Sequence, residues 1–333
     1  MAVLAIAILC ACSADGRDDI SDSDRTVPLP PSQVQLTAAL TPFESCEPFL
    51  RHIKTNALEM VGPWGLDGGY GIEIMETSEM QRDGSQPVAD SAQVGLTPGV
   101  DYSTTNVQEV GVDEPDILKT DGRRIVALAN EELWVVDVAG DQPRSLGKLR
   151  FENFWPREMF LVGDRILVFG QSHGEMKLAP QTLTSRHGRY SAISTLVEVD
   201  ISGSTPRIKR RLHLDGEYLS SRMVDDVVRI VLQSHPTGLE WSYPSRSGLR
   251  AERRAEEENR QLIEQSTIDN WIPWFALENA RGGLIGEGTL TSCERIYHPA
   301  SNSGLRMLNI ITVDLAGKQL GEELASTSVL ADG

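Results

Sequence analysis

The stretch Phe160-Leu-Val-Gly-Asp-Arg-Ile-Leu-Val-Phe169 decides the fold of this 333-residue chain. Two runs rich in Val, Ile and Leu flank Gly163-Asp164, and such a dipeptide between apolar runs is typical of a tight hairpin turn. Further apolar runs follow at residues 195–201 and 208–212. We therefore predict four strands that pair in chain order as an antiparallel meander.

The same order of strands and turns recurs in two other segments. In one, residues 119–128 turn on Asp121-Gly122 and precede apolar runs at 133–138 and 145–149. In the other, residues 222–232 turn on Asp225-Asp226 and precede runs at 308–315 and 320–324, and a fourth copy begins at Val329. Meanders that repeat every 40 to 50 residues or so are typical of propeller blades. A β-sandwich is the alternative, but it predicts no such self-similarity.

The predicted fold class is therefore all-β. Residues 104–333 are expected to form a partial β-propeller of about three four-stranded blades plus the start of a fourth. An insertion at about 235–305 splits the third copy. Within it, residues 251–265 are dense in Glu, Arg and Gln and predict a solvated helix with a Glu256–Arg260 pair. The aromatic residues of 266–275 are expected to dock this helix against a neighbouring blade.

The segment before the repeats divides into four parts. Residues 1–12 are mostly apolar and too short to span a bilayer, which indicates a signal segment, with a buried strand as the alternative. Leu9-Cys10-Ala11-Cys12 resembles a bacterial lipobox, with Cys12 the residue to be lipidated. Residues 13–41 predict a flexible tether, 42–62 an amphipathic helix capped by Ser45, and 63–103 a linker or, alternatively, a functional loop.

The four cysteines reduce to two if Cys10 leaves with the signal segment and Cys12 carries lipid. In an exported protein, the remaining Cys46 and Cys293 suggest one disulfide, with two separately buried thiols as the alternative. No CxxC pair is present, which argues against a zinc ribbon or a thioredoxin-type site.

The charged and polar residues offer few candidates for chemistry. A net charge of −17 with no long basic run argues against nucleic acid as a partner. Gly170-Gln-Ser172-His173-Gly174 matches a nucleophile elbow, but Pro180 follows closely and a hairpin loop is the favoured interpretation. The acidic residues of 113–121 are either a calcium site or solvated turn residues; they are Asp113, Glu114, Asp116 and Asp121.

Two further sets of residues are expected to be structural. Asp137, Asp200 and Asp314 recur at equivalent strand ends, where an aspartate usually caps backbone amides of the next turn. The histidines are scattered singly, so neither a metal site nor a cofactor site is predicted; they are His52, His173, His187, His213, His235 and His298.

Three stretches together resemble a known family: residues 102–122, residues 266–273, and Phe43-Glu-Ser-Cys46 with the helix that follows. They are similar to bacterial secreted proteins with a C-terminal β-propeller domain distantly related to WD repeats. The resemblance implies the fold and an exported location, and it carries no established reaction. It also implies further blades beyond Gly333, so that this chain would be truncated within the propeller.

These expectations combine into one functional prediction. The chain is expected to be an exported, lipid-anchored binding platform at the bacterial cell envelope, with an envelope protein, a polysaccharide or the missing downstream blades as partner. The alternatives are an envelope-associated hydrolase with a site in the propeller channel and a calcium-stabilised structural domain.

Overall fold

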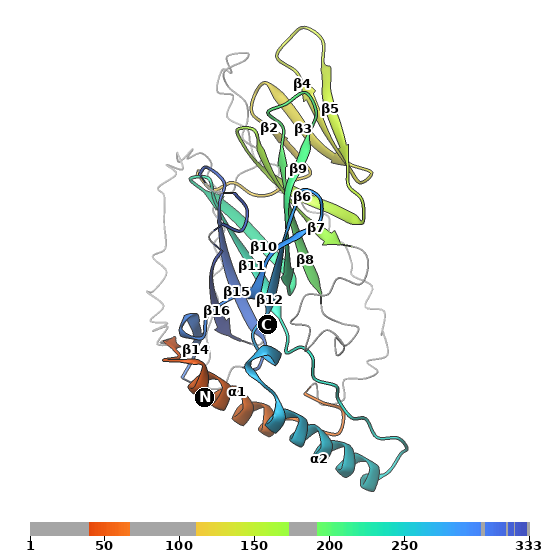
Figure 1. Ribbon diagram of the computed structural model, residues 1–333, viewed down its shortest axis with the longest axis vertical. Helices are drawn as coiled ribbons and strands as arrows, with labels where there is room; N and C mark the ends of the chain where they lie inside the picture. The colour runs from red at the N-terminus through yellow and green to blue at the C-terminus, as the bar shows by residue number, and fades with distance from the viewer. Residues whose placement is uncertain are drawn as a thin grey trace, which may run out of the picture. The chain divides into compact units, whose positions relative to one another are not determined.

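The computed structural model describes residues 40–66, 111–172, 192–300, 304–317, 319–322 and 324–331, which lie in one compact unit formed by residues 38–333. The strands of the described residues form three sheets, coloured in chain order in Figure 1. The predicted signal segment, the tether except for its last two residues, and all but the first four residues of the linker lie outside the described residues.

The first sheet is a four-stranded antiparallel meander. Its strands follow one another in space as they do in sequence: β2 (Leu118–Thr120), β3 (Arg124–Ala129), β4 (Glu132–Asp137) and β5 (Arg144–Arg150). The apolar runs at 119–128, 133–138 and 145–149 therefore lie where the repeat pattern predicts.

The second sheet contains the hairpin that turns on Gly163-Asp164. Its meander consists of β6 (Phe154–Val162), β7 (Arg165–Ser172), β8 (Ile193–Asp200) and β9 (Arg207–Asp215). The insertion adds two antiparallel strands at the outer edge, β12 (Trp274–Asn279) and β13 (Leu284–Thr289), with β12 paired to β9. The repeat pattern does not predict these two added strands.

The third sheet is a meander interrupted by the insertion. Its four strands are β10 (Glu217–Val224), β11 (Val227–Ser234), β15 (Met307–Asp314) and β16 (Ala325–Leu330). At the outer edge β14 (Ile296–His298) pairs in parallel with β16, and β1 (Thr41–Pro42) pairs with β14.

One predicted strand of the third copy is wrong. The fourth strand was expected at residues 320–324, but β16 begins at Ala325 and includes Val329, the expected start of a fourth copy. The physical reason is the alternation of side chains: Ser326, Ser328 and Leu330 are all buried on one face, as a half-buried strand requires.

Apolar cores join the sheets in chain order. Val126, Leu133 and Val135 of the first sheet share a core with residues of β7 and β8 in the second. On its other face the second sheet contributes Phe160 and Leu167 to a core shared with β11 and β15 of the third. Each sheet thus buries its apolar face against the next, and the alternative of a two-sheet sandwich is wrong.

The helical segments form a separate layer. Helix α1 (Cys46–Met60) buries Phe49, Ile53 and Ala57, and helix α2 (Leu249–Gln265) lies beside it (Figure 1). Two short 3₁₀ helices, η1 (Ile268–Asn270) and η2 (Cys293–Arg295), complete this layer. Neither α1 nor α2 combines the length and apolar character that crossing a bilayer requires.

Helix α2 is only partly the solvated helix that the sequence predicts. Ala255, Asn259 and Ile263 are buried, and Arg260 donates a hydrogen bond to the carbonyl of Leu58. Residues of the following segment, including Trp271, share a core with α1 and with Met307 of the third sheet. The aromatic segment therefore docks the helix against the third sheet.

Candidate functional site

The candidate site is the edge of the sheets at which the hairpin turns lie, called the turn edge here: residues 121–123, 163–164 and 225–226, with the strand ends next to them. The strand register shows that the copies are structurally equivalent. Asp137, Asp200 and Asp314 lie opposite Arg124, Arg165 and Val227, the first residues of β3, β7 and β11. The repeat seen in the sequence is thus a repeat of positions in space.

The three equivalent aspartates cap the turns that follow them. Their Oδ1 atoms accept hydrogen bonds from the backbone amides of Ala139 (3.1 Å), Ser202 (2.9 Å) and Ala316 (2.8 Å). The structural role predicted for these residues is confirmed. The bond from the Ala139 amide, followed by that from Arg144, lowers the pKa of Asp137, and the hydrogen bonds from Ser202 lower the pKa of Asp200.

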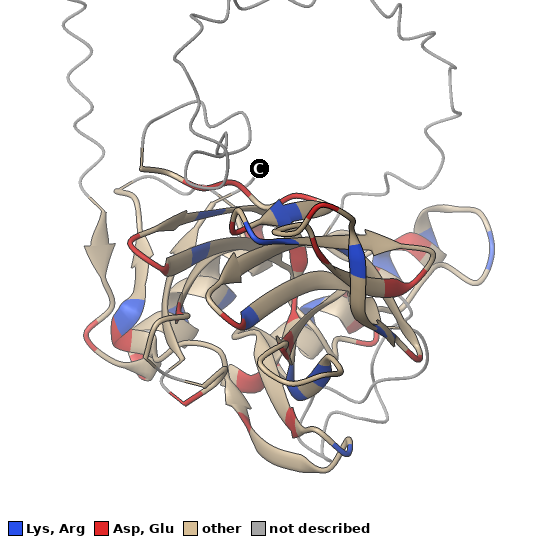
Figure 2. Ribbon diagram, turned by 90° about the horizontal axis from the view of Figure 1, so that it is seen from above, with Lys and Arg blue, Asp and Glu red and all other residues tan. Residues whose placement is uncertain are grey.

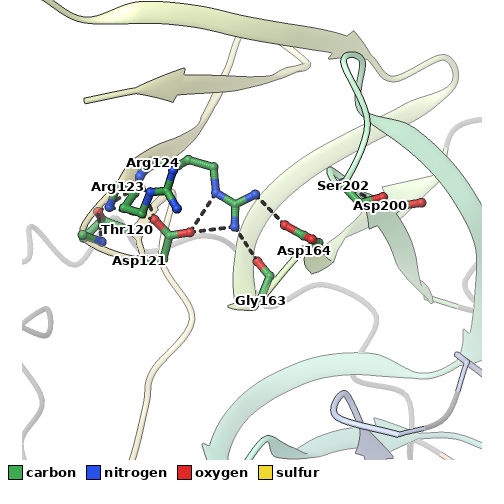
Figure 3. Close-up of polar contacts among 9 residues, drawn as sticks. Thr120, Asp121, Arg123, Arg124, Gly163, Asp164, Asp200 and Ser202 are labelled. Atoms are coloured by element: carbon green, nitrogen blue, oxygen red, sulfur yellow. Dashed lines mark hydrogen bonds and ion pairs between the residues drawn. The ribbon is translucent and has the colours of Figure 1, made fainter. Parts of the chain in front are cut away.

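Arg124 joins the turn of the first sheet to the turn of the second (Figure 3). Its Nε donates to Asp121 Oδ2 at 2.7 Å, its Nη1 to Asp164 Oδ1 at 2.6 Å and its Nη2 to the carbonyl of Gly163 at 2.9 Å. Burial opposes the charge, but the bonds to Asp164 and Asp121 outweigh it and raise the pKa of Arg124. For Asp121, burial is likewise outweighed by hydrogen bonds from Arg124 and Arg123, which lower its pKa.

Arg165 occupies the equivalent position in the second sheet and reaches the third. Its Nε donates to Glu198 Oε1 at 3.0 Å, and its Nη1 donates to the carbonyl of Leu315. Glu198 is buried and accepts the amide of Leu320 at 2.9 Å with its other oxygen. At equivalent positions, Arg124 links the first sheet to the second and Arg165 links the second to the third. The equivalent residue of the third sheet is Val227, which carries no charge.

Of the acidic residues of 113–121, Asp116 is exposed and Asp121 caps its turn, as expected for solvated turn residues, whereas Asp113 and Glu114 are half-buried. Backbone hydrogen bonds pair Asp113 with Met223 of β10 and Asp116 with Met159 of β6, so this segment connects the third and second sheets. Lys119, with 5% of its surface exposed, donates to Asp113 Oδ1 at 2.7 Å. Within the described residues no group of three His, Cys, Asp or Glu could hold a metal ion, and this leaves the calcium hypothesis without support.

A small pocket lies between the second and third sheets, next to Tyr218 and Leu196. Its free space admits on the order of one water molecule. Tyr218 donates a hydrogen bond to Glu158 and lies 2.7 Å from Ser221 Oγ. Burial, followed by the bond to Glu158, raises the pKa of Tyr218, so the phenol stays neutral and serves as a structural donor.

Ser172 of the GxSxG motif ends strand β7, and His173 and Gly174 lie outside the described residues. Its hydroxyl lies 2.9 Å from Thr195 Oγ1, which lies 3.0 Å from His213 Nδ1. His213 Nε2 in turn is 3.4 Å from Glu278 Oε2, a distance without the alignment of a hydrogen bond. Among the described residues the serine thus contacts a threonine and not a histidine, and the pocket beside this polar chain has room for about one water molecule.

The structure brings together two of the three predicted cysteine sites. Cys46 of α1 and Cys293 of η2 form a disulfide with a Cα–Cα distance of 5.0 Å, while Cys12 lies outside the described residues. Two of the histidines expected to be isolated are in contact, because the rings of His52 and His298 lie 4.8 Å apart beside Phe43. The two histidines are far apart in sequence, so the sequence does not predict this contact. The pairing of β1 with β14 brings them together.

Stacked antiparallel meanders of one repeating design, linked at equivalent positions, define a repeat-built all-β protein of the propeller class. Residues 102–333 match the model of the family described as "Beta propeller domain", and the chain belongs to this family. Comparison with curated proteins and with solved structures finds no match.

Proposed function

We propose that this chain is an exported, lipid-anchored protein that serves as a binding platform at the bacterial cell envelope. Its three meanders are blades of a propeller, and its partner is an envelope protein or a polysaccharide. The observation that carries the proposal is the linkage of successive turns by Arg124 and Arg165. These bonds hold turns from different sheets in one fixed surface, and preorganised turns on a rigid scaffold are where propellers and related folds bind partners.

Export is supported by the pairing of Cys46 with Cys293, because disulfides persist mainly outside the reducing cytosol. The anchor would be a lipid on Cys12. Metabolic labelling with an alkyne-tagged palmitate in a bacterial host tests this step: label is expected on the full chain and not on Cys12→Ser. Label on neither protein, or label that persists in the variant, would contradict the anchor.

The charge distribution agrees with a protein partner or a neutral glycan. Figure 2 shows segments of acidic and of basic residues interspersed along the ribbon. With a net charge of −17, the chain carries no excess of Lys and Arg of the kind that phosphate binding requires. The pocket with room for about one water favours a surface that binds over a channel that hydrolyses.

Co-sedimentation with envelope vesicles tests the platform. Cells are treated with lysozyme to remove wall glycan, and the full chain is used as Cys12→Ser so that lipid cannot carry it down. Reversing the exposed charges of the turn edge (Arg123→Glu, Asp225→Arg, Asp226→Arg) is expected to abolish binding. The control matched in charge reverses exposed charges on α2 (Arg253→Glu, Glu257→Arg, Glu264→Arg) and should bind normally. Equal binding by both variants would contradict the turn edge as the binding surface.

A further inference from the structure

Two large aromatic rings lie exposed side by side at the helical layer, well separated in sequence. Trp64 follows α1 and is 46% exposed, and Tyr243 precedes α2 and is 60% exposed. Their ring centroids are 6.3 Å apart and their planes are inclined by 42°. Aromatic rings bury large areas in cores and interfaces, so a pair left in water on a folded surface marks a place where something binds.

The backbone holds Trp64 at the tip of a closed turn. Gly62 and Gly65 exchange two backbone hydrogen bonds, of 2.9 and 3.1 Å, around Pro63 and Trp64. Gly65 has a φ of +93°, and a Cβ at this position would lie 3.0 Å from the ring of Trp241. The turn therefore needs glycine at residue 65 to rest on Trp241.

A single buried side chain fixes both loops to α2. Asn259, with none of its surface exposed, donates from Nδ2 to the carbonyls of Gly62 and Ser242, both at 3.0 Å. Its Oδ1 accepts the amide of Ser242 at 2.7 Å. All three bonds hold backbone on either side of the exposed rings, so the rings are positioned before any ligand arrives.

The base and the rim of this surface differ in character. Trp241 packs against the apolar core shared by α1 and the third sheet. Glu258 hydrogen-bonds Ser242 and is paired with Arg254 at 2.9 Å, and its side chain is 44% exposed. An ionised carboxylate and a guanidinium therefore stand next to the loop that carries Tyr243.

We propose that Trp64, Tyr243 and the supporting Trp241, called the aromatic patch, bind an uncharged polysaccharide. Sugar rings present an apolar C–H face that stacks on aromatic rings, and they present hydroxyls that Glu258 and Arg254 can bind. The proposal rests on the proposed function, since it names the partner that the platform would meet at the envelope.

Two other occupants fit the surface less well. A stable protein interface needs about 800 Å² per partner, far more than two rings and one ion pair supply. An anionic membrane surface is bound by clusters of Lys and Arg, whereas α1 and α2 together carry six Lys or Arg and seven Glu. A small, rigid, aromatic surface with a mixed polar rim is suited to a neutral sugar chain.

Calorimetric titration of the full chain, as Cys12→Ser, with the β-1,4-linked tetrasaccharides of glucose and of N-acetylglucosamine tests the patch. At least one is expected to bind, and Trp64→Ala or Tyr243→Ala is expected to weaken that binding about tenfold. Trp155→Ala is the matched control, because Trp155 is 53% exposed but lies on β6 in the second sheet. It should leave sugar binding unchanged.

A second variant tests the positioning of the rings without removing them. Gly65→Ala places a methyl group against Trp241 at a left-handed backbone position and should also weaken binding, with far-ultraviolet circular dichroism unchanged. The patch proposal is overturned if neither sugar binds, or if Trp155→Ala weakens binding as much as Trp64→Ala.

The sugar titration and the vesicle experiment fail independently. A chain that sediments with lysozyme-treated vesicles but binds neither tetrasaccharide would leave the platform standing and remove the patch. A chain that binds sugar through Trp64 and Tyr243 but does not sediment with the vesicles would support the aromatic patch and contradict the platform.

Discussion

Arg124 Nη1 in the first sheet donates to Asp164 Oδ1 in the second at 2.6 Å, while the same guanidinium holds Asp121 of its own turn. The side chain of Arg124 is 18% exposed, so its charge is satisfied by these partners more than by water. Successive sheets of this fold are separate hydrogen-bonded units, and stability depends on the contacts between neighbours. Arg124 is therefore expected to matter more than its place at a surface turn suggests.

Replacing Arg124 with alanine should lower the free energy of unfolding by about 1 to 3 kcal/mol, because three charge-assisted bonds are lost and two sheets are no longer linked. Urea unfolding followed by circular dichroism measures the change. Arg144→Ala is the control: Arg144 is 73% exposed and pairs only with Asp137 of its own sheet, so a change within about 0.5 kcal/mol is expected. Equal losses in both variants would contradict the linking role.

The charge of Asp121 should contribute to stability in a pH-dependent way. Its folded pKa lies below the unfolded value, so its contribution is fully present above the unfolded value of about 3.9 and is lost as the pH falls through the folded value. Asp121→Asn keeps the Oδ1 acceptor for the amides of Arg123 and Arg124 but removes the charge. The variant should be less stable at pH 7 and should approach the wild type in acid. A constant difference between pH 3 and pH 7 would rule out this ion pair as the cause.

Much of this fold could be predicted from turn chemistry and alternation. Gly163-Asp164 and the apolar runs around it locate the second meander, and the recurrence of Asp137, Asp200 and Asp314 fixes the register of all three copies. Strand β16 was misplaced, because Ala325 to Leu330 alternates Ser and Thr with few large apolar residues. Its buried positions are mostly serine, which a hydrophobic pattern does not reveal.

The site was less predictable than the fold. The links that Arg124 and Arg165 make between sheets give no local signal, since Asp164 and Leu315 lie in other sheets; Arg165 and the carbonyl of Leu315 are 150 residues apart. The two strands of the insertion were also hidden, because β12 pairs with β9, about 60 residues earlier in the chain, and β13 pairs with β12. The contact between Trp64 and Tyr243 likewise has no local signal, because it depends on two loops that Asn259 holds together.

The disulfide is expected to hold α1 against η2, the 3₁₀ helix that leads directly into β14 of the third sheet. It links α1 to η2 across 247 residues of chain, for which the chain-entropy model gives an upper limit of about 5 kcal/mol. Cys46→Ser with Cys293→Ser should lower the thermal midpoint and increase hydrogen exchange in α1, and a reducing agent should have the same effect on the wild type. Cys10→Ser is the control and should change neither. Unchanged exchange in α1 after loss of the bridge would mean that packing alone holds the helix.

The turn between β10 and β11 is strained, so substitutions there are expected to stabilise the fold. Asp225 and Asp226 both have positive φ, of 50° and 63°, and two like charges are adjacent there. Such a two-residue turn favours Asn-Gly, because asparagine and glycine adopt left-handed backbone with less strain and neither carries charge. Asp225→Asn with Asp226→Gly should raise the free energy of unfolding by about 0.5 to 1 kcal/mol. Gly163→Ala, at a φ of 56° in the turn of the second sheet, should lower it by a similar amount. Urea titration of the two variants beside the wild type measures both changes, and a loss of stability in the Asn-Gly variant would show that the aspartates make a contact that outweighs their strain.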